Sequence, residues 1–282
     1  MKNYQNQVIN FCGNSGLVPS VVEVESSIPA FIGYTSKATR KVADDLIMVP
    51  TKINSIREFE SLFGFPYAHE IEVTTVTDSS KGFAIADFKE SELKYMLYYS
   101  LRLYFENGGG TCYIVSVDTY RNARPIALRR TYWMKRFGLL DGLDQIADVN
   151  AISMVVIPEA VRLSAPDYSV LVKAVLLQCH LLGNRFAIFD LWTGENGTLN
   201  INFSKSLFGN KYLCNAAAYY PYLTTSMSSY INPEESNVKV SHDGVTTMLG
   251  EMKGQNFLLY KWIKNELKNH CLQLPACGAV AG

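Results

Sequence analysis

The sequence predicts an α/β to α+β fold, a mixed β-sheet flanked by helices. Three observations support this class. Buried β-rich runs and helical segments succeed each other along most of the chain. One strand–helix–strand unit at 151–191 has the length of a parallel crossover. Hydrophobic residues make up 48% of the 282 residues and charged residues 18%, which suits a large core. A small inserted β arm and flexible terminal extensions complete the expected architecture.

The N-terminal segment, residues 1–27, is expected to be an arm outside the core. Within it, VPSVVEVES (18–26) alternates in character, so that one face of a strand carries apolar side chains and the other carries carboxylates. Charged side chains along a strand are typical of an exposed sheet edge. The candidate edge residues are Val18, Val21, Val22, Glu23, Val24 and Glu25.

A buried strand and a short helix are expected next. IPAFIGYT (28–35) is apolar enough for a buried strand. In NSIREFESLFG (54–64), Ser55 precedes Glu58 by three positions, which is the spacing of a capping box. Gly64 is placed to end this helix.

Residues 65–90 are interpreted as a variable insertion, because only EIEVTTVT (70–77) shows a clear period, that of a hairpin arm. A helix capped by Asp87, Glu90 or Ser91 is expected to follow and to run to about Glu106.

That helix is apolar on nearly every face. One domain can hardly cover all of its faces, so Tyr95, Tyr98 and Tyr99 are candidates for burial by a partner. The alternative is that these tyrosines belong to an ordinary core.

Three consecutive glycines, Gly108 to Gly110, follow this helix and precede the β-rich run CYIVSV (112–117). A phosphate-binding loop has the opposite order, strand then glycines then helix, because the phosphate meets the N–H groups at a helix start. The glycines are therefore expected to end a helix, without a phosphate role.

The second half contains the crossover unit, made of AISMVVIP (151–158), a helix from Pro166 to Leu182, and RFAIFDL (185–191). AAAYYPYL (216–223) is interpreted as a packed turn, and a polar loop is expected at 232–244. An amphipathic helix is expected at about 256–270.

Charge and composition exclude several classes of function. Twenty-six basic and 26 acidic residues give no electrostatic reason to expect nucleic acid. The sequence contains no run of about 18 apolar residues, so no membrane-spanning helix is expected. No signal peptide is evident. The six cysteines are scattered, as in a protein with reduced thiols.

Few residues suggest catalysis. Asp118 and Asp190 each follow an expected strand, where ligands gather in open α/β sheets, so a small-molecule hydrolase or phosphotransferase is the alternative function. Strand-end aspartates more often cap turns. Cys179 and His180 are adjacent on a helix and point in different directions. His270, Cys271 and Cys277 lack zinc spacing, so no metal or other cofactor is expected.

Five segments resemble the tail sheath protein family, the subunits of the contractile sheath in phage tails and related injection particles. The segments are IPAFIGYTSKA (28–38), INSIREFESLFG (53–64), YFENGGGTCYIVSV (104–117), AAAYYPYL (216–223) and LPACGAVAG (274–282). They occur in the family's order and span most of the chain. The chain departs from the family at its opening strand and at Tyr222, where Trp is frequent.

The resemblance implies a non-enzymatic structural subunit that polymerises helically around an inner tube and contracts to drive it through a target envelope. The implied partners are other copies of the chain, the inner tube protein, and baseplate and terminator proteins. Strand exchange by the arm would link the copies. The implied setting is the bacterial cytoplasm during assembly and then a phage virion tail or injection particle.

Family members continue past the last block, so the resemblance implies that the chain lacks their C-terminal portion. The expected organisation is an arm at 1–27, a sheath core at 28–64 and 91–282, and the insertion at 65–90. A monomeric binding module is a third possibility, supported only by the many aromatic residues.

Overall fold

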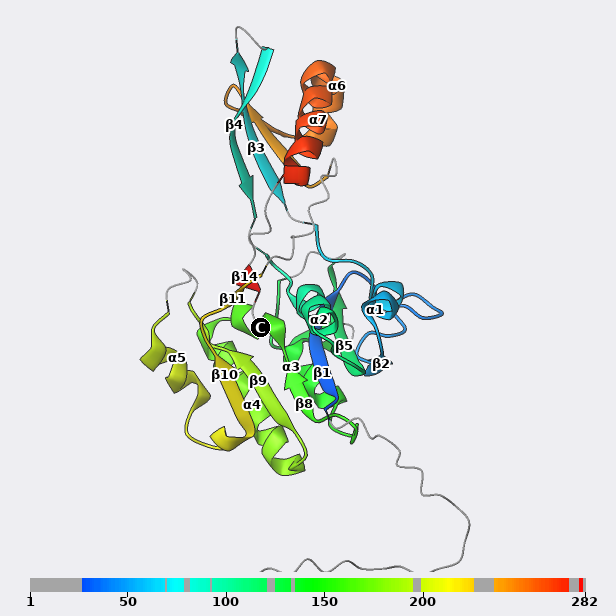
Figure 1. Ribbon diagram of the computed structural model, residues 1–282, viewed down its shortest axis with the longest axis vertical. Coiled ribbons are helices and arrows are strands. Elements are labelled where there is room, and N and C mark those ends of the chain that lie inside the picture. The colour runs from blue at the N-terminus through cyan, green and yellow to red at the C-terminus, as the bar shows by residue number, and fades with distance from the viewer. Residues whose placement is uncertain are drawn as a thin grey trace, which may run out of the picture.

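The computed structural model describes residues 27–68, 70–78, 82–91, 93–120, 125–132, 135–194, 199–225, 236–273 and 279–280. Figure 1 shows two bodies along the long axis of the molecule. The larger body contains β1 (Pro29–Thr35), β2 (Thr51–Ile53), α1 (Ile56–Phe63), α2 (Leu97–Glu106), β5 (Cys112–Thr119), β6 (Arg130–Tyr132), β7 (Lys135–Phe137), α3 (Leu139–Gln145), β8 (Met154–Val156), the 3-10 helix η2 (Pro158–Arg162), α4 (Ala165–Leu182), β9 (Phe186–Asp190), α5 (Ile201–Phe208), η3 (Leu213–Asn215) and β10 (Ala216–Tyr219).

The smaller body contains β3 (Ile71–Asp78), β4 (Gly82–Glu90), β12 (Val238–His242), β13 (Val245–Met248), α6 (Leu249–Gln255) and α7 (Phe257–Gln273). The short strands β11 (Leu223–Thr224) and β14 (Ala279–Val280) pair with each other. Several connecting segments run between the two bodies, and the described residues 64–68 and 93–96 belong to two of them.

The larger body is built on a six-stranded sheet with the order β10-β9-β8-β1-β5-β2. All neighbours in it are parallel except β2, which is antiparallel to β5. The unit β8–α4–β9 is the parallel crossover that the sequence predicts. The predicted fold class, a mixed sheet flanked by helices, is confirmed.

The central strand β1 is buried along its whole length. Ala30, Ile32 and Tyr34 belong to the core formed with α3 and α4. Phe31 belongs to the core formed with α1 and α2 on the other face. Because successive side chains of a strand point to opposite faces, this pattern shows that helices cover both faces of the sheet at β1.

Two local predictions are confirmed at α1. The Ser55 hydroxyl accepts a hydrogen bond from Glu58 N at 3.2 Å, and Glu58 Oε2 accepts one from Asn54 N at 2.9 Å. These bonds satisfy N–H groups at the helix start, which have no partner within the helix. Gly64 ends the helix with φ of 83°.

The predicted order of helix, glycines and strand is also confirmed. Gly109 N donates to Tyr104 O at 2.9 Å, and Gly108 has φ of 85°. Left-handed backbone of this kind is typical of glycine after a helix. The strand β5 follows directly, so the glycines end a helix and do not begin one.

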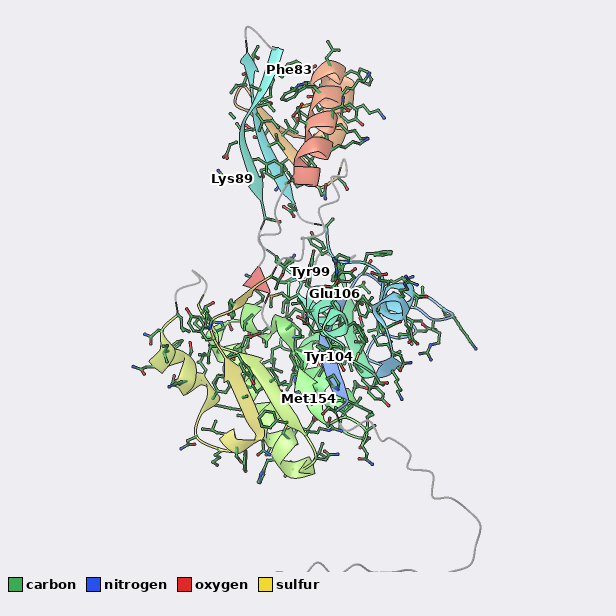
Figure 2. All side chains as sticks on the ribbon, in the orientation of Figure 1. Phe83, Lys89, Tyr99, Tyr104, Glu106 and Met154 are labelled. Atoms are coloured by element: carbon green, nitrogen blue, oxygen red, sulfur yellow. The ribbon has the colours of Figure 1, made fainter. Side chains whose placement is uncertain are left out.

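The predicted start of α2 is wrong. Asp87 and Glu90 lie in β4, and the helix begins only at Leu97. In Figure 2, Phe83 and Lys89 lie on β4 in the smaller body, whereas Tyr99 lies on α2 in the larger one.

The smaller body is a four-stranded sheet, β13-β12-β3-β4, covered by α6 and α7. The predicted hairpin arm is present as β3–β4, and it pairs in parallel with β12. Residues 238–242 are therefore a strand, and the expectation of a polar loop there is wrong. Residues 238–273 fall within the range 91–282 that is expected to form the sheath core. They belong to the sheet and the hydrophobic core of the smaller body, together with the hairpin.

Candidate functional site: the strand-end crevice

The carboxyl ends of the parallel strands are the place where an open α/β sheet binds a ligand. The chain passes from β1 to β5 on one side and then to β8 on the other side of β1. Strand order thus reverses between β1 and β8, and the crevice beyond this point is the candidate functional site. Its walls come from the ends of β1, β5 and β8 and from the start of α2.

Glu159 follows β8 closely and fills the crevice next to α2. Its side chain is fully buried, and Oε1 accepts hydrogen bonds from Met96 N at 3.2 Å and Leu97 N at 3.0 Å. Gly33 of β1 leaves the space for this carboxylate, since a Cβ there would lie 3.0 Å from Glu159 Cδ. Helix N-termini attract anions, and at α2 the anionic group that accepts from the first N–H groups is the chain's own carboxylate.

Burial and hydrogen bonding have opposite effects on Glu159. Burial raises the pKa of the carboxyl group, and the backbone N–H donors, led by Leu97, lower it. Burial has the larger effect, and the pKa rises from the ordinary 4.5 to about 7. The position therefore holds a carboxyl group that changes charge near neutral pH.

Four tyrosines fill the crevice beside Glu159. The ring centroids of Tyr95 lie 4.6 Å from Tyr120, 5.5 Å from Tyr34 and 5.3 Å from Tyr67. Burial raises the pKa of Tyr34 and of Tyr95 to about 12. These phenols stay neutral near neutral pH, and the cluster is a packed aromatic core with little room for a ligand.

An opening of about 410 Å³ remains above the tyrosines, between the segments that join the two bodies. Its lining includes Tyr67, Leu93, Lys94 and Arg162. Arg162 Nη2 donates to Leu93 O at 2.7 Å, and Lys94 Nζ lies 5.8 Å from the ring centroid of Tyr67 in the other connecting segment. Both cations thus contact the chain itself across the joint.

Asp118 and Asp190 do not share a site. They lie at the ends of β5 and β9, which are separated by β1 and β8. Three strand spacings correspond to about 14 Å, too far for two carboxylates acting on one small group. Asp118 Oδ1 accepts from Thr119 N at 2.8 Å, a bond between neighbouring residues at the end of β5. Burial raises the pKa of Asp190 to about 7.

The reason for expecting a partner over Tyr95, Tyr98 and Tyr99 is not supported. Their side chains are 2%, 8% and 2% exposed within this chain. The two latter residues pack in the core of α1 and α2, and Tyr98 Oη donates to Glu60 Oε1 at 2.7 Å. One domain does cover these faces of the helix, because α1, β1 and η2 surround it. The arm residues Val18 to Glu25 lie outside the described residues.

The remaining candidate groups do not assemble into a site. Cys179 is buried, whereas His180 is exposed and stacks on Tyr212 at 4.1 Å between ring centroids. Among the described residues, no cluster of three or more His, Cys, Asp or Glu side chains could hold a metal ion. No helix in the same part of the chain has the length and apolar character to cross a bilayer. Cys277 lies outside the described residues, and no side-chain position is described for His270 or Cys271.

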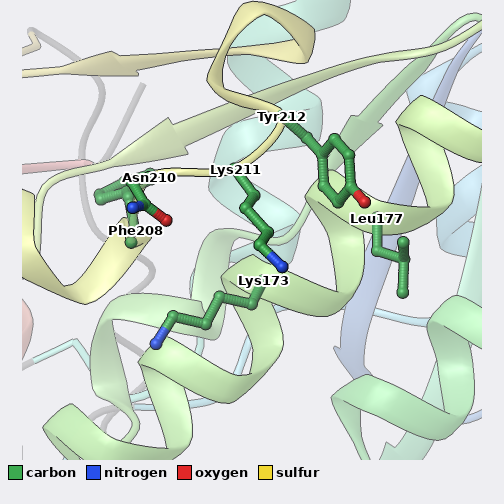
Figure 3. Close-up of a pocket in the computed structure, with 7 residues that line it drawn as sticks. Lys173, Leu177, Phe208, Asn210, Lys211 and Tyr212 are labelled. Atoms are coloured by element: carbon green, nitrogen blue, oxygen red, sulfur yellow. The ribbon is translucent and has the colours of Figure 1, made fainter.

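A second cavity, an open groove of about 330 Å³, lies between α4 and the loop that follows α5 (Figure 3). Lys173 and Leu177 line it from α4, and Phe208, Lys211 and Tyr212 line it from the end of α5 and the loop that follows. Neither lysine forms an ion pair with a described residue. The groove is basic and partly apolar, and it faces outward.

Sequence reasoning missed Glu159, the residue that dominates the crevice. Its position after a buried strand is the same signal that marks Asp118 and Asp190. The N–H groups it accepts from lie 62 and 63 positions away, and no local pattern indicates them.

Comparison with known proteins gives likenesses of structure only. No protein-family model matches the sequence, and no curated protein matches it. The chain is similar to a chain in the cryo-EM structure of the anti-feeding prophage baseplate in its contracted state, with a TM-score of 0.45 and 17% identity. The likeness covers 89% of this chain and 56% of that chain, so the matched region is about half of the other protein. At this level of similarity it assigns no function.

Proposed function

We propose that the chain is a structural subunit of a contractile sheath, which polymerises helically around an inner tube and contracts to drive the tube through a target envelope. The observation that carries the proposal is the filled crevice. The usual ligand position of the sheet is occupied by Glu159 and by tyrosines of the same chain. The five sequence segments that resemble tail sheath proteins, in the family's order, add to it.

The outer surface is where such a subunit would act. On α4, Val170, Leu177 and Leu181 are 48%, 42% and 73% exposed. Spacings of seven and four residues place them on one side of the helix. Exposed apolar side chains that gather on one side of a helix favour a contact surface, and an equal number of basic and acidic residues does little to keep copies apart. We assign these side chains to contact with a second copy of the chain.

The remaining parts of the proposal follow from the sheath role. The arm at 1–27 would lend a strand to a neighbouring copy, with Val18, Val21, Val22, Glu23, Val24 and Glu25 in the contact. The partners would be the inner tube protein and baseplate and terminator proteins. Assembly would take place in the bacterial cytoplasm, and the product would be a phage tail or an injection particle.

Electron microscopy of the purified protein tests the proposal. Rods or tubes of constant diameter are expected, because a heterologous contact that does not close into a ring generates filaments. Leu181→Glu should shorten or abolish the rods, whereas Val245→Glu, at a residue 63% exposed on the smaller body, is the matched control. Deletion of residues 1–27 should prevent polymerisation and leave the core folded.

Two results would contradict the sheath role. One is a discrete particle at all concentrations, with Leu181→Glu behaving as wild type. The other is hydrolysis of a small phosphate ester or ester that is lost in both Asp118→Asn and Asp190→Asn, which would favour the enzymatic alternative.

A further inference from the structure

Two of the segments that join the bodies meet at the crevice. Residues 64–70 lead from the larger body to β3, and residues 91–96 return from β4. Tyr67 of the first segment packs edge-on against Tyr95 of the second, with ring centroids 5.3 Å apart. The second segment leads directly into α2, whose first N–H groups are bonded to Glu159. One buried carboxylate thus holds the end of a connection between the bodies.

We propose that Glu159 is a proton-sensitive latch, which fixes residues 93–96 and, through them, the connection to the smaller body at the strand ends. The latch is closed when the carboxyl group is buried beneath Gly33 and the start of α2. It is open when the segment lifts and water reaches the carboxyl group. This proposal concerns the single chain and does not depend on the sheath role.

The contacts that define the closed latch are given by the structure and do not depend on a pKa value. Met96, the residue before α2, makes no side-chain cap bond to the helix. The backbone N–H groups of Met96 and Leu97 therefore depend on Glu159 for an acceptor. Glycine is the only residue type that lacks a Cβ, and its presence at position 33 of β1 leaves room for the Glu159 carboxylate. When the segment opens, these N–H groups and the carboxylate would form hydrogen bonds with water instead of with each other.

The groups that face Glu159 determine how the latch responds to pH. Tyr34 of β1, Tyr95 before α2, and Tyr120 after β5 surround it, and burial raises the pKa of all three. They remain protonated between pH 6 and pH 8. Asp118 of β5 adds a carboxyl group at the strand ends. Near neutral pH, the three tyrosines therefore leave the change of charge to Glu159.

Two basic side chains, Lys94 and Arg162, lie near the crevice. Lys94 lies over the rings of Tyr67 and Tyr95, and Arg162 donates to Leu93 O. Both side chains contact the connecting segments, whether Glu159 is protonated or ionised.

The sign of the response follows from linkage. The closed state has a Glu159 pKa of about 7, and in the open state the group returns to the ordinary 4.5. The closed state binds the proton more tightly, so rising pH favours opening. Between pH 6 and pH 8, these two values give an increase of about tenfold in the opening equilibrium.

Hydrogen–deuterium exchange of the purified wild-type protein at pH 6, 7 and 8 tests the latch. After division by the intrinsic exchange rates, protection of the amides at 96–99 should fall about tenfold from pH 6 to pH 8. The amides at 58–60 of α1, in the same sample, are the internal control and should keep constant protection. Glu159→Gln is neutral at every pH and keeps an acceptor oxygen, so its protection at 96–99 should be independent of pH. Glu58→Gln should change protection at α1 only.

Equal pH dependence at 96–99 and at 58–60 in the wild type would overturn the proposal. So would a Glu159→Gln protein that keeps the wild-type response at 96–99. If Glu159→Gln fails to fold, infrared titration of the buried carboxyl group in the Asp190→Asn protein decides, because that substitution removes the other carboxyl group with a pKa of about 7. A band that titrates near pH 7 supports the latch, and the lack of one above pH 5.5 overturns it.

Discussion

Replacing Gly33 with Ala is expected to force the Glu159 carboxylate away from the start of α2. A Cβ at Gly33 would overlap the carboxylate, and all three of the nearest atoms to it belong to Glu159. The backbone of Gly33 does not have positive φ, so Ala brings no backbone strain of its own. The cost of the substitution therefore comes from one side chain.

The size of the effect follows from the hydrogen bonds that the displaced carboxylate would give up. Two of them, at 3.0 and 3.2 Å, would be broken, and each is worth about 1.5–3 kcal/mol as a bond to a charged group. Hydration of the displaced carboxylate offsets part of this cost. The free energy of unfolding should fall by about 2–4 kcal/mol.

Urea unfolding of four proteins measures the effect: wild type, Gly33→Ala, Glu159→Ala and the double variant. Once Glu159 is shortened, the methyl group at Gly33 has room, so the two changes should be strongly non-additive. Gly254→Ala is the matched control, because a Cβ there meets nothing within 4 Å and lies in α6. It should stabilise the protein by up to about 1 kcal/mol. Costs that add to within about 0.5 kcal/mol in the double variant would refute the reasoning.

Three further predictions concern stability. Ser55→Ala removes the acceptor for Glu58 N and should lower the unfolding free energy by about 1 kcal/mol in urea titration; an unchanged midpoint would contradict the cap. Arg185→Ala should cost about 3 kcal/mol by the same assay, because Arg185 is 4% exposed and donates to Val149 O at 2.7 Å; Arg185→Lys should not restore it. The folded-state pKa of Asp190 is raised to about 7, so its contribution to stability falls as pH rises from 3.8 to 7. Asp190→Asn should therefore gain up to about 4 kcal/mol over wild type at pH 8 and little at pH 4, measured by thermal unfolding; an equal gain at both values would be inconsistent with burial of the charge.

The sequence predicts elements whose signals are local. The capping box of α1 lies within four residues and forms as expected. The crossover β8–α4–β9 is continuous in sequence, and its order leaves one common topology. The glycines after α2 have an order that excludes a phosphate loop without any tertiary information.

The strand β4 escapes prediction because its periodicity is broken. Between β3 and β4, the pairing passes from Thr74–Asp87 to Thr75–Ile85, which leaves Ala86 as a bulge. Phe83, Ile85 and Phe88 all pack toward the core of the smaller body. Their spacing of two and then three residues fits neither a regular strand nor a helix. The pattern is therefore not recognisable as a strand, and the capping roles expected of Asp87 and Glu90 are wrong.

The crevice could be predicted only in part. Strand-end carboxylates are expected at Asp118 and Asp190, yet strand order places them about 14 Å apart. The order depends on which side of β1 each later strand joins, which no local pattern specifies. The burial of Tyr98 and Tyr99 likewise depends on α1 and β1 closing over α2. Composition can show that a helix needs cover, but it cannot show which neighbour provides it.

The pairing of β3 with β12 has a consequence for synthesis on the ribosome. Val238 aligns with Ile71 in this parallel pair, and their side chains share one core. About 150 residues separate the end of β4 from β12, so at ribosomal rates of about 5–20 residues per second the hairpin waits roughly 7–30 s for its partner strand. During that interval its apolar face has no cover from α6 or α7. The nascent chain thus exposes an unpaired strand edge in every round of translation, and chaperone binding to residues 71–90 would shield it until the last helices emerge.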